Sequence, residues 1–462
     1  MQGALFALPA GDLRFAVGTG YRKNEFDYQP DRGISTQNIT SLTIGLFDTS
    51  ETQGAISVKE AYVEFLAPVL KDKFLVQSLD LNAGYRHSEY DTATGGVGTW
   101  KFTADWSVND FVRFRGGRQS ANRAPNVAEL FQPAVFSTVP WPDHDPCSNL
   151  TRAAYGNVAS NPNRTQVQAL CSALSGGFPI GNNYVGNQPT YFPAGRDLTV
   201  GNPNVDSEKA NTWTIGTVLR SPFEMDALSR LTLSLDYYSI TIDGAIAPAT
   251  TQTVYQNCFN GLGTNPNYDP NNPYCQLILR LPSNGFWLAT RAQYQNLGMI
   301  ETKGIDAQLD WSANTPFFGG ESGTVFANIN FNYLDSYDVQ NFVGGPVLEY
   351  AGTVGAPISS PPYGAQFRWK LFTTVGYTAG PATLSLAWRH LPSADHVALA
   401  TNPAATQLSV PSYDIFSLAE MGRDAGVYGS CGRGQSVRRG AEHRRHPARC
   451  DGSCGRDGHG VV

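Results

Sequence analysis

The chain has 462 residues, of which 11% are aromatic and only 16% are charged, against roughly 25% charged residues in soluble proteins. Mean hydropathy is -0.27, and no apolar run approaches the roughly 20 residues that a membrane-spanning helix needs. Residues 1–420 carry a net charge of -10, which argues against a nucleic-acid-binding protein, whereas residues 421–462 carry a net charge of +4.

The first residues, MQGALFALPAGDLRF, lack the basic start, the long apolar run and the cleavage site of a signal peptide. Either the chain is not exported or its true N-terminus is missing. No helical domain is expected. Twelve segments have strand character, at about 12–22, 56–67, 76–88, 99–108, 111–120, 209–220, 230–243, 300–312, 322–335, 364–378, 382–390 and 411–419.

The segments 99–108 and 111–120 show the strand pattern most clearly. Both alternate apolar side chains, many of them aromatic, with polar ones, and Val108-Asn109-Asp110 predicts a tight reversal between them. The expected hairpin has aromatic residues on one face and cations, including Arg113 and Arg115, on the other. In a soluble sandwich the aromatic face would form the core, whereas in an outer-membrane barrel it would contact lipid.

Connection lengths favour the barrel. Segments 23–55, 121–208, 244–299, 336–363 and 391–410 are long connections, and they alternate with short ones at 68–75, 108–110, 221–229, 313–321 and 379–381. Outer-membrane barrels have short periplasmic turns and longer external loops, whereas a soluble sandwich has no reason to sort its loops in this way. The sequence therefore predicts an all-β fold, an antiparallel transmembrane β-barrel.

Four cysteines fall in the two longest connections. Cys147 and Cys171 lie in the first, and Cys258 and Cys275 lie in the second. Two cysteines in each external loop suit disulfides formed in an oxidising compartment. Metal binding is the competing interpretation, but the spacings are too wide for a zinc pattern. No metal site and no cofactor is expected.

From residue 1 to about 419 the chain resembles the barrel of TonB-dependent outer-membrane receptors. The order and spacing of several short motifs carry the resemblance. These motifs are Gly54–Pro68 (GAISVKEAYVEFLAP), Arg123–Pro125 with Glu129–Phe131, Gly201–Val205 with Ser207–Lys209, Asp236–Tyr238, Lys303–Asp306 and Ser412–Phe416.

The resemblance implies a 22-stranded barrel in outer-membrane lipid, plugged by an N-terminal globular domain whose TonB box recruits the energising TonB complex. The family normally has two more strands after the last one recognised here, 411–419. The chain therefore supplies about strands 9–20 of the 22, and the plug domain is absent. We therefore expect residues 1–419 to form a partial barrel, a fragment that does not transport by itself. The expected location is the outer membrane of a Gram-negative cell.

Three arginines, Arg86, Arg113 and Arg115, point inward on the predicted alternation. They either contact the plug, which the resemblance favours, or assist the passage of an anionic substrate. For the stretch 123–131, the structural interpretation is an Arg-Glu pair and a proline that end the strand at the external rim. We favour it over ligand contact.

Ligand recognition is expected in the external loops, because aromatic side chains on tethered loops suit chelates or sugars. Packing of the loop on itself is the alternative. The turn-rich segment 265–273 (NPNYDPNNP) lacks the spacing of a calcium loop. The candidate ligand-binding residues are Trp141, Asp143, His144, Tyr184, Tyr191, Phe192 and Arg196.

The tail, residues 420–462, breaks the alternation and is rich in Gly, Arg and His. A disordered basic tail and a metal site formed by its cysteines and histidines are two interpretations. The third, which we favour, is a frameshift. When the codons from Glu420 are shifted by one nucleotide, residues 432–441 can encode Gly-Val-Asp-Asn-Leu-Phe-Asp-x-Glu-Pro, the motif that the family resemblance predicts there.

The predicted function is TonB-energised uptake of a scarce large solute, such as a ferric siderophore, cobalamin or an oligosaccharide. The protein is not expected to be an enzyme, since the histidines outside the tail, at 87, 144, 390 and 396, are scattered. One alternative is a passive porin-like barrel. The other is a secreted β-rich glycan-binding or hydrolytic protein, which would need a convergent carboxylate pair that the sequence does not reveal.

Overall fold

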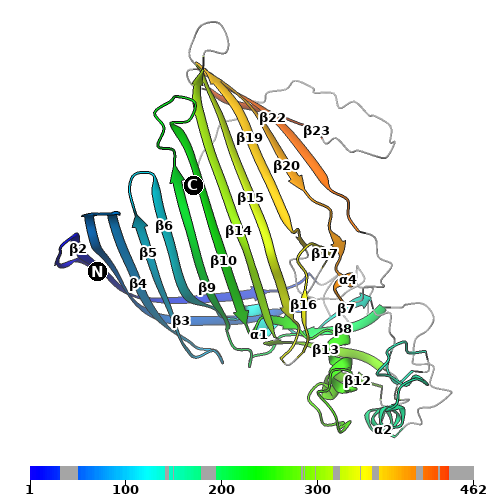
Figure 1. Ribbon diagram of the computed structural model, residues 1–462. Coiled ribbons are helices and arrows are strands. Elements are labelled where there is room, and N and C mark those ends of the chain that lie inside the picture. The colour runs from blue at the N-terminus through cyan, green and yellow to red at the C-terminus, as the bar shows by residue number, and fades with distance from the viewer. Residues whose placement is uncertain are drawn as a thin grey trace.

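The computed structural model describes residues 1–31, 50–140, 145–148, 150–177, 194–281, 285, 287–296, 298–315, 323–343, 345–355, 364–401, 409–424 and 427–435. Their dominant feature is one large, strongly curved antiparallel sheet (Figure 1). Within these residues no helix is long and apolar enough to span a membrane.

The large sheet follows chain order, each strand pairing with the next one along its path. The short strand β16 (Val347–Glu349) pairs with β15 outside that path. In order of pairing the strands are β1 (Gln2–Leu8), β2 (Gly11–Tyr28), β3 (Thr52–Lys73), β4 (Val76–Tyr90), β5 (Gly96–Ser107), β6 (Val112–Arg123), β9 (Glu208–Arg220), β10 (Arg230–Asp243), β14 (Met299–Thr315), β15 (Gly323–Gln340), β19 (Trp369–Ala379), β20 (Ala382–Leu391), β22 (Tyr413–Asp424) and β23 (Val427–Gln435).

Each of the twelve expected strands has a counterpart in this sheet, and the partial antiparallel barrel is confirmed. Three details differ. The strand β1 was not expected, and the segment 364–378 forms two strands, β18 (Gly364–Gln366) and β19, in different sheets. The strand β22 continues beyond residue 419 to Asp424, and β23 pairs with it within the tail.

The short turns have a local chemical cause. Between β5 and β6, the Asn109 side-chain oxygen accepts hydrogen bonds from the backbone N–H groups of Phe111 (2.9 Å) and Val112 (2.8 Å). This reverses the chain within four residues. Between β19 and β20, Gly380 has a φ of +53°, which glycine adopts without steric cost. The predicted reversal at Val108–Asp110 is confirmed.

The large sheet has an apolar face and a polar face. Along β14, for example, Ile305 and Leu309 lie on the apolar face, and Asp306 and Asp310 lie on the polar face. Directly opposed residues on paired strands share a face, so the strand register extends the apolar face and the polar face from each strand to the next. Large apolar side chains of the apolar face are exposed on every part of it, including Phe65, Phe102, Phe114, Ile215, Leu235, Ile305, Val375 and Leu386.

The two longest connections fold together at the end of the sheet opposite the short turns (Figure 1). We call this unit the disulfide module. In its sheet β8 (Ala194–Val200) pairs with β13 (Trp287–Asn296) in parallel and with β7 (Val135–Pro140) in antiparallel orientation. Its other elements are β11 (Ile246–Pro248), β12 (Ile278–Arg280), α2 (Arg164–Leu174), α3 (Thr251–Cys258) and the 3-10 helix η1 (Cys275–Leu277).

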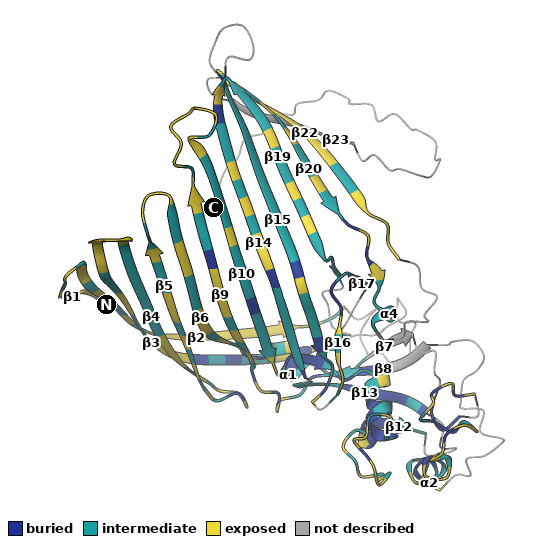
Figure 2. Ribbon diagram, in the orientation of Figure 1, coloured by how far each residue is buried: buried dark blue, intermediate teal, exposed yellow. Residues whose placement is uncertain are grey.

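The disulfide module holds the largest cluster of buried apolar side chains among the described residues. In Figure 2 buried residues gather there, whereas the strands of the large sheet are mostly intermediate or exposed. A second cluster joins the module to the sheet through Ile56 of β3, Leu130 of α1 (Val127–Phe131), Val205 and Ile246. The third sheet of the described residues is the smallest and contains β17 (Thr353–Gly355), β18 and β21 (Asp395–His396), with α4 (Ala398–Thr401) nearby.

Candidate functional site

A row of polar side chains crosses the polar face near the middle of the strands. In the register, Arg115 on β6 stands opposite Gly216 on β9, and Gly216 stands opposite Asp236 on β10. The row continues through β14 to Asn332 on β15 and Lys370 on β19. These residues come from segments far apart in the sequence, and five successive strand pairings bring them together.

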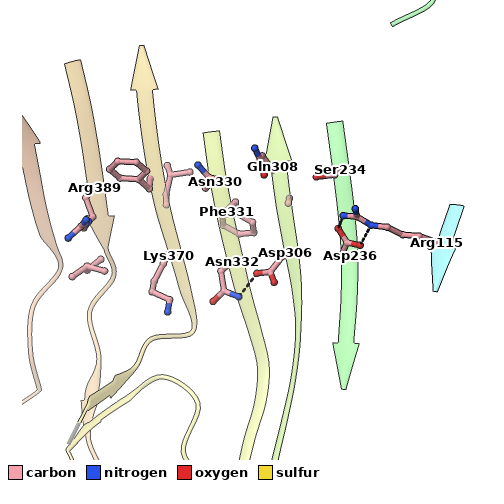
Figure 3. Close-up of a pocket in the computed structure, with 14 residues that line it drawn as sticks. Arg115, Ser234, Asp236, Asp306, Gln308, Asn330, Phe331, Asn332, Lys370 and Arg389 are labelled. Atoms are coloured by element: carbon pink, nitrogen blue, oxygen red, sulfur yellow. Dashed lines mark hydrogen bonds and ion pairs between the residues drawn. The ribbon is translucent and has the colours of Figure 1, made fainter. Parts of the chain in front are cut away.

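Arg115 reaches across β9 to bind Asp236. Its Nε donates to one carboxylate oxygen at 2.8 Å and its Nη2 donates to the other at 2.5 Å (Figure 3). Gly216 lies beneath this pair, and a Cβ added there would stand 2.0 Å from Asp236 Oδ1. The ion pair therefore depends on the absence of a side chain at position 216.

The row lines a hollow of about 490 Å³ that also reaches Arg389 on β20. In Figure 3 the Asn332 amide donates to Asp306 (2.8 Å), while Lys370 and Arg389 lie on the neighbouring strands β19 and β20. Within the described residues, neither of these two cations forms an ion pair with a carboxylate. The Arg389 guanidinium lies 5.6 Å from the centre of the Phe372 ring.

The other arginines that the alternation placed inward also lie on the polar face and have partners within the sheet. Arg113 Nε donates to Asp105 at 2.7 Å, and a second contact makes the pair bidentate. Arg86 lies 3.7 Å from Glu60 and packs over the Tyr62 ring. The sheet thus neutralises these cations itself.

At the module end of β6, Arg123 joins two carboxylates. Its guanidinium donates two hydrogen bonds to Glu208 (both 2.7 Å) and two to Glu129 (3.0 and 3.1 Å). Glu129 also completes a capping box with Asn126 at the start of α1, and Glu208 accepts from the backbone N–H of Ile246. These contacts favour the structural interpretation of the stretch 123–131.

Both cysteine pairs of the disulfide module form disulfides in the structure, Cys147 with Cys171 and Cys258 with Cys275. A buried ion pair lies beside the first disulfide. Arg280 donates to both Asp145 oxygens (2.8 and 3.0 Å), and the two side chains are 4% and 3% exposed. Since a buried pair is costly to break, it fixes the chain directly after residues 141–144.

Asp197 on β8 is a second buried carboxylate in the module, 5% exposed. It accepts a hydrogen bond from the Thr251 hydroxyl at the start of α3. Burial disfavours the charged carboxylate more than this hydrogen bond and the Thr251 backbone N–H favour it. The pKa of Asp197 is therefore raised to about 6.

Most of the predicted ligand-binding residues lie outside the described residues. These are Trp141, Asp143, His144, Tyr184, Tyr191 and Phe192. Arg196 lies in β8, where its backbone pairs with Thr138 of β7. No cluster of three or more potential metal ligands occurs in the described part of the chain, and residues 436–462, including Cys450 and Cys454, are not in that part.

Sequence reasoning did not single out Asp306, Lys370 and Arg389 as members of one site. Strand alternation places each of them on the polar face, and this placement is the sequence feature that could have indicated the site. Their meeting depends on the relative register of β14, β15, β19 and β20, and the sequence pattern of single strands does not fix it.

Residues 2–422 match the family model described as TonB dependent receptor-like, beta-barrel. Two similar solved structures are the siderophore receptor PirA from Acinetobacter baumannii and a mutant ferric enterobactin receptor from Pseudomonas aeruginosa in complex with enterobactin. For the first, the TM-score is 0.51 at 12% identity, over 92% of this chain and 48% of that one. For the second, the TM-score is 0.54 at 12% identity, over 94% of this chain and 47% of that one. The chain thus spans just under half the length of each. No curated protein sequence matches it.

Proposed function

Because the chain belongs to the TonB-dependent receptor β-barrel family, we propose that it forms part of the wall of an outer-membrane receptor that takes up a scarce large solute. Barrels of this family are transporters of the Gram-negative outer membrane. The two similar structures named above are a siderophore receptor and a ferric enterobactin receptor, which favours a ferric siderophore over cobalamin or an oligosaccharide as the solute.

The division of the sheet into two faces is the observation that carries this proposal. Its exposed apolar face is far larger than a soluble monomer exposes, and it suits contact with outer-membrane lipid. The strands β14 and β15 have 17 and 18 residues, more than the roughly 9–11 that a tilted strand needs to cross a bilayer. The polar face, with Arg86, Arg113 and Arg115, lines the lumen in this proposal.

The disulfide module supplies the external end of the receptor. It lies at the end of the sheet where the long connections gather, and its two disulfides suit an oxidising, external compartment. We assign solute capture to this end, with Trp141, Asp143, His144, Tyr184, Tyr191, Phe192 and Arg196 as candidate contacts. Energy for passage comes from the TonB complex acting on a plug in the lumen.

Uptake measurements test this function. Cells that produce the complete receptor, with this chain as part of its wall, are supplied with labelled ferric enterobactin, cyanocobalamin or maltohexaose, with and without a functional TonB complex. We expect surface binding of one probe in both strains but its accumulation only in the strain with TonB. Accumulation that does not depend on TonB would contradict the proposal and favour a passive, porin-like barrel.

A further inference from the structure

We infer that Arg118 binds a phosphate group of a membrane lipid in the external leaflet, on the apolar face of the large sheet. The inference rests on the proposed function, because that function places the apolar face against outer-membrane lipid. It assigns a ligand to the outward surface of the wall, opposite the lumen.

The position of Arg118 within the apolar face is the first argument. In the register, Arg118 on β6 stands opposite Phe102 on β5 and Trp213 on β9, and both aromatic side chains are exposed. The alternation that puts Arg113 and Arg115 on the polar face puts Arg118 on the other one. A guanidinium on a lipid-facing surface is costly unless a polar or anionic group binds it.

The lack of a carboxylate partner is the second argument. Within the described residues Arg118 is exposed and forms no ion pair, and its guanidinium lies 5.9 Å from the centre of the Trp100 ring. By contrast, Lys303 on the same face of β14 donates to Glu301 at 2.7 Å. The charge of Arg118 is therefore available to an anion from outside the chain, and phosphate is the anion that membrane lipids carry.

The level of Arg118 in the membrane is the third argument. Arg118 stands six residues from Val112, the first residue of β6 after the short turn, which is about 20 Å along the strand. At a tilt of about 35–45° this is a rise of about 15 Å, counted from the short turns, in an apolar band about 25 Å tall.

The direction of the side chain adds to this rise. Trp100 lies farther from the short turns than Phe102 does, so the Arg118 guanidinium extends toward the end of the sheet that carries the disulfide module (Figure 1). Long cationic side chains near a membrane interface extend toward the headgroups in this way. Because the module end is external in the proposed function, the headgroups are those of the external leaflet.

The surroundings of Arg118 suit a whole lipid better than a free phosphate ion. Toward the short turns, the exposed side chains of Phe114 and Ile215 offer an apolar surface to acyl chains. Toward the module, Ser120 stands opposite Asn211, two residues beyond Arg118 on the same face. Their hydroxyl and amide groups can donate to further oxygens of the headgroup. A phosphorylated lipid would use both parts of this surface.

Lipid binding by the complete receptor, with this chain as part of its wall, tests the inference. The receptor is titrated in a neutral detergent with lipid A, a phosphorylated glycolipid, and native mass spectrometry measures the bound fraction. We expect Arg118→Gln to bind lipid A about tenfold more weakly than the unaltered receptor, since a charge-assisted hydrogen-bond donor is lost. Arg118→Lys, which keeps the charge, should lose less. Dephosphorylated lipid A should bind equally to the unaltered receptor and to Arg118→Gln.

Arg14→Gln is the matched control, because Arg14 is an exposed arginine on the polar face, in register with Leu66, Asn82 and Thr103. It should leave lipid A binding unchanged. Equal lipid A affinity in Arg118→Gln and the unaltered receptor would overturn the inference, and so would an equal loss in Arg118→Gln and Arg118→Lys. Displacement of lipid A by inorganic phosphate at the same concentration would also overturn it, since the site would then take the free ion.

The outcome is separable from that of the uptake test. If lipid A binding falls in Arg118→Gln but no probe accumulates in a TonB-dependent manner, the lipid site stands and the proposed function fails. If accumulation depends on TonB and Arg118→Gln binds lipid A normally, the function stands and the lipid site is wrong.

Discussion

Replacing Asp197 by asparagine should remove a pH dependence from the stability of the disulfide module. The Asp197 carboxylate is buried on β8 and accepts a hydrogen bond from Thr251 at the start of α3. An asparagine oxygen can accept the same hydrogen bond without a charge. The substitution therefore tests the cost of holding this carboxylate ionised.

The magnitude follows from the shift in pKa. The pKa of Asp197 is about 6 in the folded module, against an ordinary value of 3.8. Because the folded state binds the proton more tightly, stability is highest below pH 3.8 and falls as the pH rises toward 6. The total loss is about 3 kcal/mol, at about 1.4 kcal/mol for each unit of pKa. Above about pH 7 the loss is complete and constant.

Hydrogen exchange at the amides of α3 measures this effect. At each pH between 4 and 8, the opening free energy of the unaltered chain is subtracted from that of Asp197→Asn, which cancels the intrinsic pH dependence of exchange. We expect the difference to grow by about 2.5 kcal/mol between pH 4 and pH 7, because part of the total loss already occurs below pH 4. Asp269→Asn, at an exposed carboxylate of the module, should show no such growth. A difference for Asp197→Asn that stays constant within about 1 kcal/mol would refute the reasoning.

Three further substitutions test other contacts. Gly216→Ala should lower the free energy of unfolding by about 1–3 kcal/mol, because the added methyl group overpacks against Asp236. Gly20→Ala is the control and should leave the free energy of unfolding unchanged, since the space around Gly20 is open. Thermal melts in detergent compare the two variants. Arg123→Gln should lower the free energy of unfolding by about 2 kcal/mol, because the carboxylates of Glu129 and Glu208 lose their shared hydrogen-bond donor. Faster proteolysis between β6 and α1 would show this loss. Replacing Cys147 and Cys171 together by serine should destabilise the module by about 3 kcal/mol, as expected for a loop of this length. Unchanged exchange protection of α2 would contradict that estimate.

The strands could be predicted because their cause is local. Alternation of apolar and polar side chains encodes which face each residue joins, and Asn109 encodes a turn through its own side chain. The break in the segment 364–378 was not visible, because it depends on distant contacts. Arg368 there donates to the backbone carbonyls of Asp335 (2.7 Å) and Ala351 (3.0 Å).

The candidate site could be predicted only in part, because the contacts between its residues also depend on segments that are distant in the sequence. Alternation placed Arg113 and Arg115 on the polar face, but it did not reveal that Asp105 and Asp236 neutralise them. The grouping of the cysteines by connection was visible in the sequence. The parallel pairing of β8 with β13, which joins those two connections into one module, depends on residues about 90 positions apart.

The assignment of the two faces to lipid and lumen is the central claim, and site-directed spin labelling tests it most directly. Single cysteines replace each residue from 305 to 310 on β14, in a chain whose tail cysteines at 431, 450 and 454 are alanine. Collision rates with oxygen, which partitions into lipid, and with a water-soluble nickel chelate are measured in membranes. We predict that labels at 305, 307 and 309 favour oxygen and that labels at 306, 308 and 310 favour the nickel chelate. Collision rates without this two-residue period, or with the opposite phase, would contradict the account.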